Sequence, residues 1–284
     1  MSTMETAATA RATTASTLGD RVGDPDFRDL LRSEWTKIRT VRSTMWALVA
    51  LVVLTISFTV LLSWLTTSQW DVIDPAARQQ LMADPASQIL GSGFQFSQLA
   101  ICVLGVLVMT GEYSSGTIRA SLLAVPGRTP MLVAKAIVFA GLAFVVAEVA
   151  AFPSFFIGSA IFHSRVPVSI TDAGVLRAVI GVGLYIAVLG VFAIAVGALV
   201  RHTAGAITGI IGFVLVLSPL TLLLPGSIGA HIHAYLPTEA GQQITTTFQS
   251  PDRLLGPWQG LGVFCIWTIA LMVVANYALT HRDA

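Results

Sequence analysis

Long uncharged hydrophobic segments alternate with short polar ones along most of this chain. A transmembrane helix needs about 20 apolar residues to cross the ~30 Å hydrocarbon core of a bilayer. The segments that meet this requirement run over residues 44–67, 89–110, 131–162, 176–200, 204–224 and 258–279. The third is longer than one crossing needs, so we expect it to be tilted or broken near Pro153. The pattern predicts an all-α, multi-pass membrane bundle of six transmembrane helices.

The composition excludes a soluble protein of this size. Of the 284 residues, 55% are hydrophobic and only 11% are charged, and the mean hydropathy is +0.78. Charged residues make up about 25% of a typical soluble domain. The net charge of +1 gives no basic field for nucleic acid, so we expect membrane lipids and no nucleic acid among the partners. Cys102 and Cys265 both lie inside apolar segments, where we interpret them as small buried hydrophobic side chains.

The charges in the loops predict how the chain crosses the membrane. Residues 1–23 are rich in Ala, Thr and Ser and lack an apolar core, so we interpret them as a disordered cytoplasmic tail rather than a secretory signal. If the N-terminus is inside, most of the 16 Lys and Arg residues fall in cytoplasmic segments, in agreement with the positive-inside rule. We therefore expect a protein of the cytoplasmic membrane with both termini in the cytoplasm.

An amphipathic helix is predicted over residues 24–43, just before the first span. Asp24 suits an N-cap and Pro25 suits the first helical position. Apolar residues recur there at three- and four-residue spacing and form one stripe, which arginines flank where they can reach anionic lipid headgroups. Two compatible interpretations stay open: a membrane-surface anchor that orients the first span, or an elbow that also contacts a cytoplasmic partner.

A compact polar segment, "GEYSSGTIRASLLAVPGR" at 111–128, joins the second and third spans on the cytoplasmic side. Gly111 can end a helix and Gly116 can turn the chain, after which 117–124 can form a short helix. Glu112 and Arg119 could pair across the turn. A short helix held between two spans is suited to transmit a conformational change from a cytosolic motor protein. The alternative is an ordinary inner loop, which would carry similar charges.

Two stretches of the sequence carry a resemblance: "LLRSEWTKIRTVRSTMW" before the first span and "GEYSSGTIRASLLAVPGRTPMLVAKA" after the second. Together they resemble the membrane subunit of a type-2 ATP-binding-cassette (ABC-2) exporter. The six-span layout with both ends inside is similar too, so the resemblance covers nearly the whole chain after the tail. It implies that 24–284 form one ABC-2 type transmembrane domain that exports a substrate. It also implies a second permease copy, in a homodimer or a heterodimer.

The resemblance assigns roles to two sets of residues. The loop after the second span would be the coupling helix that docks on a cytosolic ABC ATP-binding subunit, with Glu112, Tyr113, Gly116, Thr117 and Arg119 at the docking site. The amphipathic segment would be a connecting helix, whose interface residues would be Trp35, Lys37, Arg39 and Arg42.

The chemistry of ATP hydrolysis is expected on another polypeptide. A P-loop requires the pattern Gly-x-x-x-x-Gly-Lys-Ser/Thr, because its backbone amides and lysine cradle the phosphates. The only two lysines, Lys37 and Lys135, follow Thr36 and Ala134, so neither completes that pattern. We therefore expect a transport subunit that is not an enzyme and has no cofactor of its own. ATP and Mg would bind to the partner subunit.

Glu148 is an unusual feature of the third span, in "FVVAEVAAF". A carboxyl group in mid-membrane is costly and suggests a function by default. It could line the translocation path, where it would contact substrate or carry a proton. It could equally be a packing residue that faces another helix.

Two other classes of function stay open. His231, His233 and Glu239 cluster in the long outer loop at 225–257, with His163 expected nearby, and such a set could bind zinc in an integral-membrane enzyme. The set lacks a helical His-x-x-x-His frame and an obvious fourth ligand. The loop is also apolar in "SIGAHIHAYL", which predicts one or two short interfacial helices. The other class is a non-transporting scaffold subunit, which would use the same docking elements without a substrate path.

Overall fold

The protein is described here by a computed structural model that covers residues 26–116, 128–247 and 253–281, and its regular elements in these ranges are all helices. Among these residues, six helices are long and apolar enough to cross a membrane. They are α3 (Arg42–Ser68), α5 (Pro85–Ser114), α7 (Arg128–Phe162), α8 (Val175–Val200), the segment Thr203–Thr221 and α13 (Pro257–His281). The predicted all-α, six-span bundle is confirmed.

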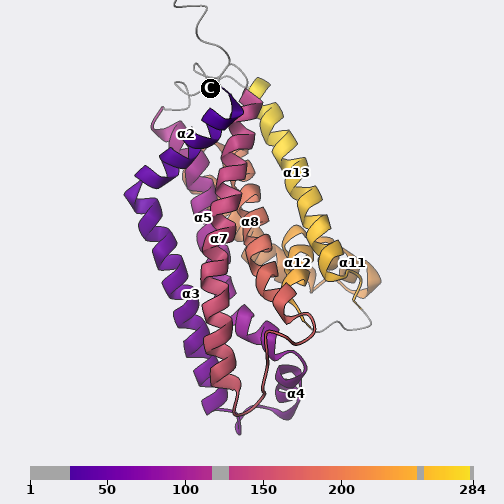
Figure 1. The fold of residues 1–284 in the computed structure, drawn as a ribbon. Helices are drawn as coiled ribbons and strands as arrows, with labels where there is room; N and C mark the ends of the chain where they lie inside the picture. The colour runs from indigo at the N-terminus through magenta and orange to yellow at the C-terminus, as the bar shows by residue number, and fades with distance from the viewer. Residues whose placement is uncertain (1–25, 117–127, 248–252, 282–284) are drawn as a thin grey trace, which may run out of the picture.

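The helix α8 lies at the centre of the bundle, between α5, α7 and α13, while α3 packs on the outer side of α5 and α7 (Figure 1). Small residues permit the closest approaches, since backbones in a membrane bundle come together where side chains are absent. A Cβ atom at Gly105 of α5 would lie 2.8 Å from the carbonyl oxygen of Gly190 of α8, and one at Gly190 would lie 2.8 Å from the ring of Phe139 of α7.

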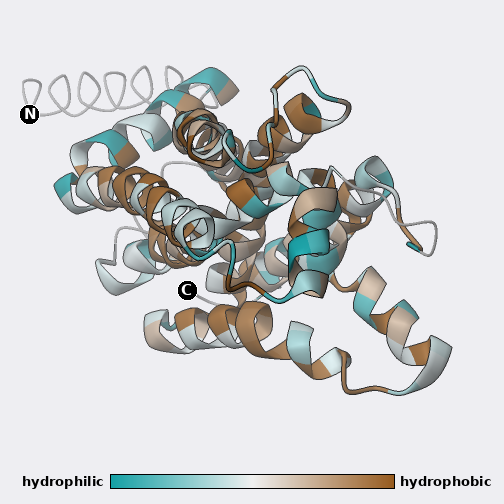
Figure 2. Cartoon of the chain, turned by 90° about the horizontal axis from the view of Figure 1, so that it is seen from below, coloured by the Kyte–Doolittle hydropathy of each residue, from teal (hydrophilic) through white to brown (hydrophobic). Residues whose placement is uncertain are grey.

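The long helices are hydrophobic over most of their circumference, and polar residues are concentrated in the short helices and loops (Figure 2). Helices of this kind are either buried in a large core or exposed to lipid. Much of α3, α13 and the Thr203–Thr221 segment is exposed at the outside of the bundle, with 22% of the most apolar part of each buried. These three helices therefore present apolar surface to lipid or to another membrane protein.

Helix boundaries differ from the predicted spans at functionally important points. The helix α5 continues through Gly111 to Ser114, so Glu112 and Tyr113 belong to its last turn. The chain turns instead at Gly116, whose φ of +71° lies in the left-handed region that favours glycine. The helix α7 runs without a break through Pro153, as membrane helices allow when neighbouring groups satisfy the freed carbonyl.

The amphipathic helix is α2 (Phe27–Thr40), which is separated from α3 by the extended residue Val41. It turns Leu30, Glu34 and Ile38 into the bundle. These residues are four apart and therefore share one face of the helix. A glutamate thus lies buried between two apolar residues. Whether α2 rests on a membrane surface stays a prediction.

The fifth span is irregular, and the loop after it is helical as predicted. The span consists of α9 (Thr203–Gly212), a π-helical turn η1 (Phe213–Leu217) and α10 (Ser218–Thr221). It is followed by α11 (Gly226–Tyr235), α12 (Pro237–Gln242) and a 3₁₀ turn η2 (Gln243–Thr245). These short elements pack beside the start of α13, on the side of the bundle away from α2 (Figure 1). A further short helix, α4 (Pro75–Ala83), precedes α5.

Candidate functional site

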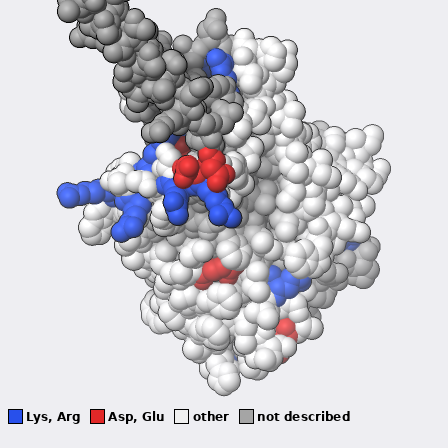
Figure 3. Space-filling view, turned by 45° about the horizontal axis from the view of Figure 1, so that its top comes forward, with Lys and Arg blue, Asp and Glu red and all other residues white. Residues whose placement is uncertain are grey.

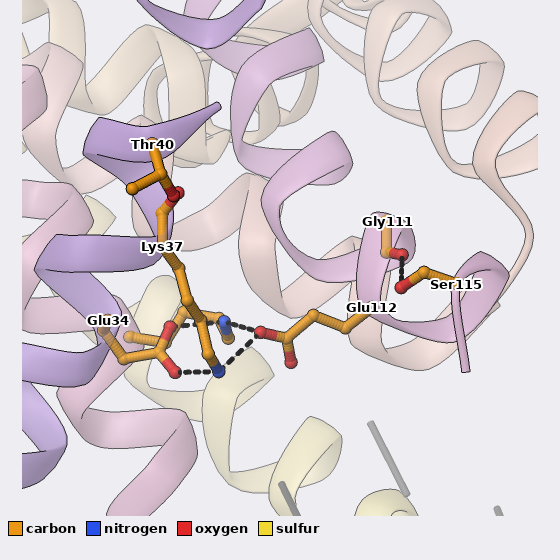
Figure 4. A network of polar contacts seen from close by, with 7 residues as sticks. Glu34, Lys37, Thr40, Gly111, Glu112 and Ser115 are labelled. Carbon is orange, nitrogen blue, oxygen red and sulfur yellow. Dashed lines mark hydrogen bonds and ion pairs between the residues drawn. The ribbon is translucent and has the colours of Figure 1, made fainter. Parts of the chain in front are cut away.

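Four charged side chains from three helices meet in one cluster at the α2 end of the bundle (Figure 4). Lys135 Nζ of α7 lies 2.5 Å from Glu34 Oε2 of α2 and 2.7 Å from Glu112 Oε1 of α5. Lys37 Nζ of α2 lies 2.7 Å from Glu34 Oε1 and 3.0 Å from Glu112 Oε1. Each lysine therefore bridges the same two carboxylates, and we call these four residues the charge cluster.

The charge cluster is electrically balanced and mostly buried. The side chains of Lys135, Glu34 and Glu112 are 1%, 4% and 10% exposed, and that of Lys37 is 38% exposed. Removing an ion from water costs several kcal/mol, and only well-placed opposite charges recover that cost. The cluster is thus stable as a set of two carboxylates and two ammonium groups, and the loss of a buried member would leave a charge without compensation.

Lys37 is held in its charged form. Burial by itself lowers the pKa of this ammonium group, but hydrogen bonds and favourable charge interactions with Glu34 and Glu112 outweigh that effect, so the pKa of Lys37 is raised above its ordinary value. At neutral pH this lysine is therefore a permanent cation at the solvent-facing edge of the charge cluster.

Local sequence explains how each member reaches the cluster. Glu34 and Lys37 are three residues apart on α2 and therefore lie on one face. Glu112 comes from the last turn of α5 because that helix continues past Gly111. Lys135 lies two turns into α7. The charge cluster consequently ties α2 to both helices that flank residues 117–127, the predicted coupling segment, which lies outside the described residues.

Basic and acidic side chains gather on the surface at the same end of the molecule (Figure 3). Arginines of α2 and of the start of α3 are exposed there, as the amphipathic pattern predicts; they are Arg28, Arg32, Arg39 and Arg42. A cavity of about 460 Å³ opens beside the cluster, with Ile38, Leu104 and Leu107 among its apolar walls.

The predicted coupling residues divide into three groups. Glu112 points into the charge cluster, and Tyr113 lies beneath the guanidinium of Arg201, 5.5 Å from the ring centre. Gly116 forms the turn that ends the described part of this segment. Thr117 and Arg119 lie outside the described residues, as does the expected short helix at 117–124. The assignment of these residues to ATPase docking stays a prediction.

The predicted connecting-helix residues also divide. Trp35, Arg39 and Arg42 are exposed, whereas Lys37 takes part in the charge cluster. Sequence reasoning missed Glu34 and Lys135 altogether. Each had a signal, since Lys135 is a cation inside an otherwise apolar span and Glu34 lies on the apolar stripe of its helix.

The structure does not assemble the predicted zinc site. His233 Nε2 lies 3.4 Å from Glu239 Oε2, but His231 is exposed and its Nδ1 lies 2.7 Å from the carbonyl oxygen of Ser227. Side chains two residues apart on a helix project to different sides, so the His-x-His pair on α11 does not converge. His163 lies exposed after α7. In the ranges that the structure covers, no group of three His, Cys, Asp or Glu residues is placed to hold a metal.

Glu148 lies on α7 in the interface with α8. Its carboxyl group fits over Gly183, because a Cβ atom there would lie 2.1 Å from Glu148 Oε1. Both carboxyl oxygens are shielded from solvent. The glycine is therefore what gives this carboxyl group room between the two helices.

The fold and the charge cluster define a multi-pass membrane protein whose amphipathic helix α2 is held to the bundle by buried ion pairs. The chain matches the family model for the ABC-2 family transporter protein over residues 30–224, which is more than half of its length and includes the whole charge cluster. No curated protein matches it. The chain belongs to the ABC-2 transporter family and is a membrane subunit of an ABC transporter. Family members of this kind are transport components without an ATPase site of their own, which agrees with the missing P-loop.

Proposed function

We propose that this chain is the permease of an exporter in the cytoplasmic membrane, driven by ATP hydrolysis on a separate cytosolic subunit that binds ATP and Mg. The observation that supports this proposal best is the charge cluster, which joins α2 to the end of α5 and the start of α7. Those are the two helix ends from which residues 117–127 would be presented to an ATPase.

The charge cluster would make the three helix ends move as one body. Breaking a buried ion pair costs about 3–5 kcal/mol. A displacement of residues 117–124 would therefore move α2 and the bundle together, rather than shift α2, α5 and α7 relative to one another. Closure of the ATP-binding subunits would then rock the bundle from inward-open toward outward-open, as a rigid-body transition. In this mechanism Glu112 and Lys37 are positioning residues, and direct docking falls to the exposed Trp35 and Arg39 and to Arg119.

The proposed orientation places the charge cluster on the cytoplasmic side. The exposed arginines around α2 fit that side by the positive-inside rule. The end of α13 returns to the same end of the bundle, where Arg128 Nη1 at the start of α7 donates a hydrogen bond of 2.5 Å to the carbonyl oxygen of Leu279. Both termini would therefore be cytoplasmic.

A second permease copy would enclose the path. The α9 helix offers a surface for it, since glycines on its outer side have open space around them; they include Gly209 and Gly212. Small residues on an exposed membrane face let two helices approach closely. We propose a dimer through this face.

The test is a mild-detergent pull-down of the tagged full-length chain, with co-purifying proteins identified by mass spectrometry and assayed for Mg-ATP hydrolysis. The proposal expects a stoichiometric P-loop subunit. A chain that elutes without such a subunit under several mild conditions would contradict it. A scaffold subunit would bring down the same partner, but the reconstituted complex would move no substrate.

A further inference from the structure

A second cavity lies on the side of the bundle away from the charge cluster. It has a volume of about 400 Å³ and is lined by residues of α10, α11, α12, η2 and the segment before α13. Ligand pockets in proteins typically measure about 300–1,000 Å³ and combine apolar walls with a few polar groups. The walls here are largely apolar, with Leu222, Leu224, Leu254 and Leu255 among them, and five polar side chains interrupt them: Thr221, His233, Glu239, Gln243 and Arg253.

Two of those polar groups form a pair of hydrogen-bond acceptors. Thr221 Oγ1 donates its one hydrogen to the carbonyl oxygen of Ser218, at 2.7 Å. It can therefore only accept from His233 Nδ1, which lies 2.8 Å away, and so Nδ1 carries the ring proton. In the neutral form of the ring the other nitrogen, Nε2, is an acceptor, and it lies 3.4 Å from a carboxylate oxygen, Glu239 Oε2.

This acceptor pair is open to a ligand. The side chains of His233 and Glu239 are 26% and 20% exposed, and both line the cavity. The other carboxyl oxygen, Oε1, already accepts a hydrogen bond from Ser218. A group with several N–H donors and a positive charge, such as a primary ammonium, would satisfy Nε2 and Oε2 together.

The guanidinium group of Arg253 places a positive charge at the same cavity. Arg253 Nη1 lies 2.7 Å from Gln243 Oε1 and 2.8 Å from Thr246 Oγ1, and both of these partners are uncharged. Among the described residues Arg253 forms no ion pair. Gln243 also connects it to α12, because Gln243 Nε2 donates to the carbonyl oxygen of Glu239. A guanidinium in this setting is suited to a phosphate.

We propose that this cavity binds the headgroup of an ethanolamine phospholipid. The ammonium group lies between His233 Nε2 and Glu239 Oε2, the phosphate meets Arg253, and the start of the acyl chains packs on the leucine walls. A choline headgroup fits less well, because its quaternary nitrogen has no N–H to donate. The site needs no ATPase partner, so its test is independent of the proposed transport function.

Native mass spectrometry of the purified full-length chain in maltoside micelles tests the site. The probes are lysophospholipids of equal chain length with ethanolamine, choline or glycerol headgroups, together with free phosphoethanolamine. We expect the ethanolamine lipid to bind about tenfold more tightly than the choline lipid, as one charge-assisted hydrogen bond would give. In Glu239→Gln that preference should disappear, and in Arg253→Gln binding of both zwitterionic lipids should weaken about tenfold.

Arg165→Gln is the matched control, because Arg165 is an arginine on another loop, 3.5 Å from Asp71, and it does not line the cavity. It should bind all probes as the wild type does. Arg253 is exposed, so Arg253→Gln keeps the test decisive even if Glu239→Gln fails to fold. Equal binding of the ethanolamine and choline lipids, or unchanged binding in Arg253→Gln, would overturn the proposal. Tight binding of free phosphoethanolamine would overturn the assignment to a lipid.

Discussion

Lys135 Nζ lies 2.7 Å from Glu112 Oε1 and so joins α5 to α7, the two helices that residues 117–127 connect in the sequence. The same ammonium group lies 2.5 Å from Glu34 Oε2 and so also binds the amphipathic helix α2. A fully buried lysine with carboxylates from two other helices fixes those helix ends relative to one another. The charge cluster thus connects α2 to both helices that flank the predicted coupling segment.

Replacing the two lysines one at a time distinguishes what the buried part of the charge cluster contributes to stability from what its exposed edge contributes. Lys135→Met should destabilise the protein by about 3–5 kcal/mol, because it leaves Glu34 and Glu112 with one partly exposed cation between them. Lys37→Met removes the same charge from a side chain that is 38% exposed and should cost about 1 kcal/mol or less. Thermal unfolding of both variants in the same detergent measures the difference.

The pairing itself is checked by a double variant. Adding Glu112→Gln to Lys135→Met neutralises one of the uncompensated carboxylates and should recover part of the lost stability. Strictly additive losses, or equal unfolding temperatures for Lys135→Met and Lys37→Met, would mean that the cluster contributes no coupling between these helices.

A substitution at Gly116 tests the role of the turn that leads into the predicted coupling segment. Its φ is +71°, whereas proline requires about −65°, so Gly116→Pro should redirect the chain after α5 and abolish partner-dependent transport. A Cβ atom at this position would meet nothing within 4 Å, so the effect comes from the backbone alone. Gly111→Ala, at a helical position that also has open space, is the control. Transport by a membrane-inserted Gly116→Pro variant at the wild-type rate would refute the role of this turn.

Gly209 tests the proposed dimer face on α9. A Cβ atom there meets nothing within 4 Å in the single chain, so Gly209→Leu should leave the fold intact while it blocks close approach of a second copy. Gly141 on α7 has the same open space, and Gly141→Leu serves as the matched control. Light scattering after size-exclusion chromatography should show monomers for Gly209→Leu and dimers for Gly141→Leu. Two dimeric variants would place the interface elsewhere.

Glu148→Gln tests whether the carboxyl group over Gly183 serves transport. Glutamine keeps the shape and removes the ionisable group, and a carboxyl group is costly in a membrane, so we expect an equal or higher unfolding temperature. If Glu148 lines the path, transport by the reconstituted complex should fall at least about tenfold, which corresponds to ~1.4 kcal/mol. Ser154→Ala, a polar deletion in the same helix, is the control. Normal transport combined with lower stability would identify Glu148 as a packing residue.

Hydropathy located all six spans but not their ends. A run of apolar residues is a local property, whereas the end of α5 depends on which glycine adopts a left-handed conformation. Gly111 stays helical and Gly116 turns, and both are glycines in polar surroundings. That difference moved Glu112 and Tyr113 from a predicted loop into the last turn of α5, where Glu112 is buried and Tyr113 half-buried.

The sequence by itself determined the class of protein. With few charges and six long apolar segments, the chain must satisfy its backbone hydrogen bonds within each segment inside a bilayer, and helices do so without reference to the rest of the fold. Only the tertiary structure decided the chemistry between the helices. Glu34 and Lys135 are 101 positions apart and meet because α2 packs on α7, while His231 and His233 are neighbours in sequence and diverge because they share one helix. Contacts of this kind depend on packing, which no local pattern of residues specifies.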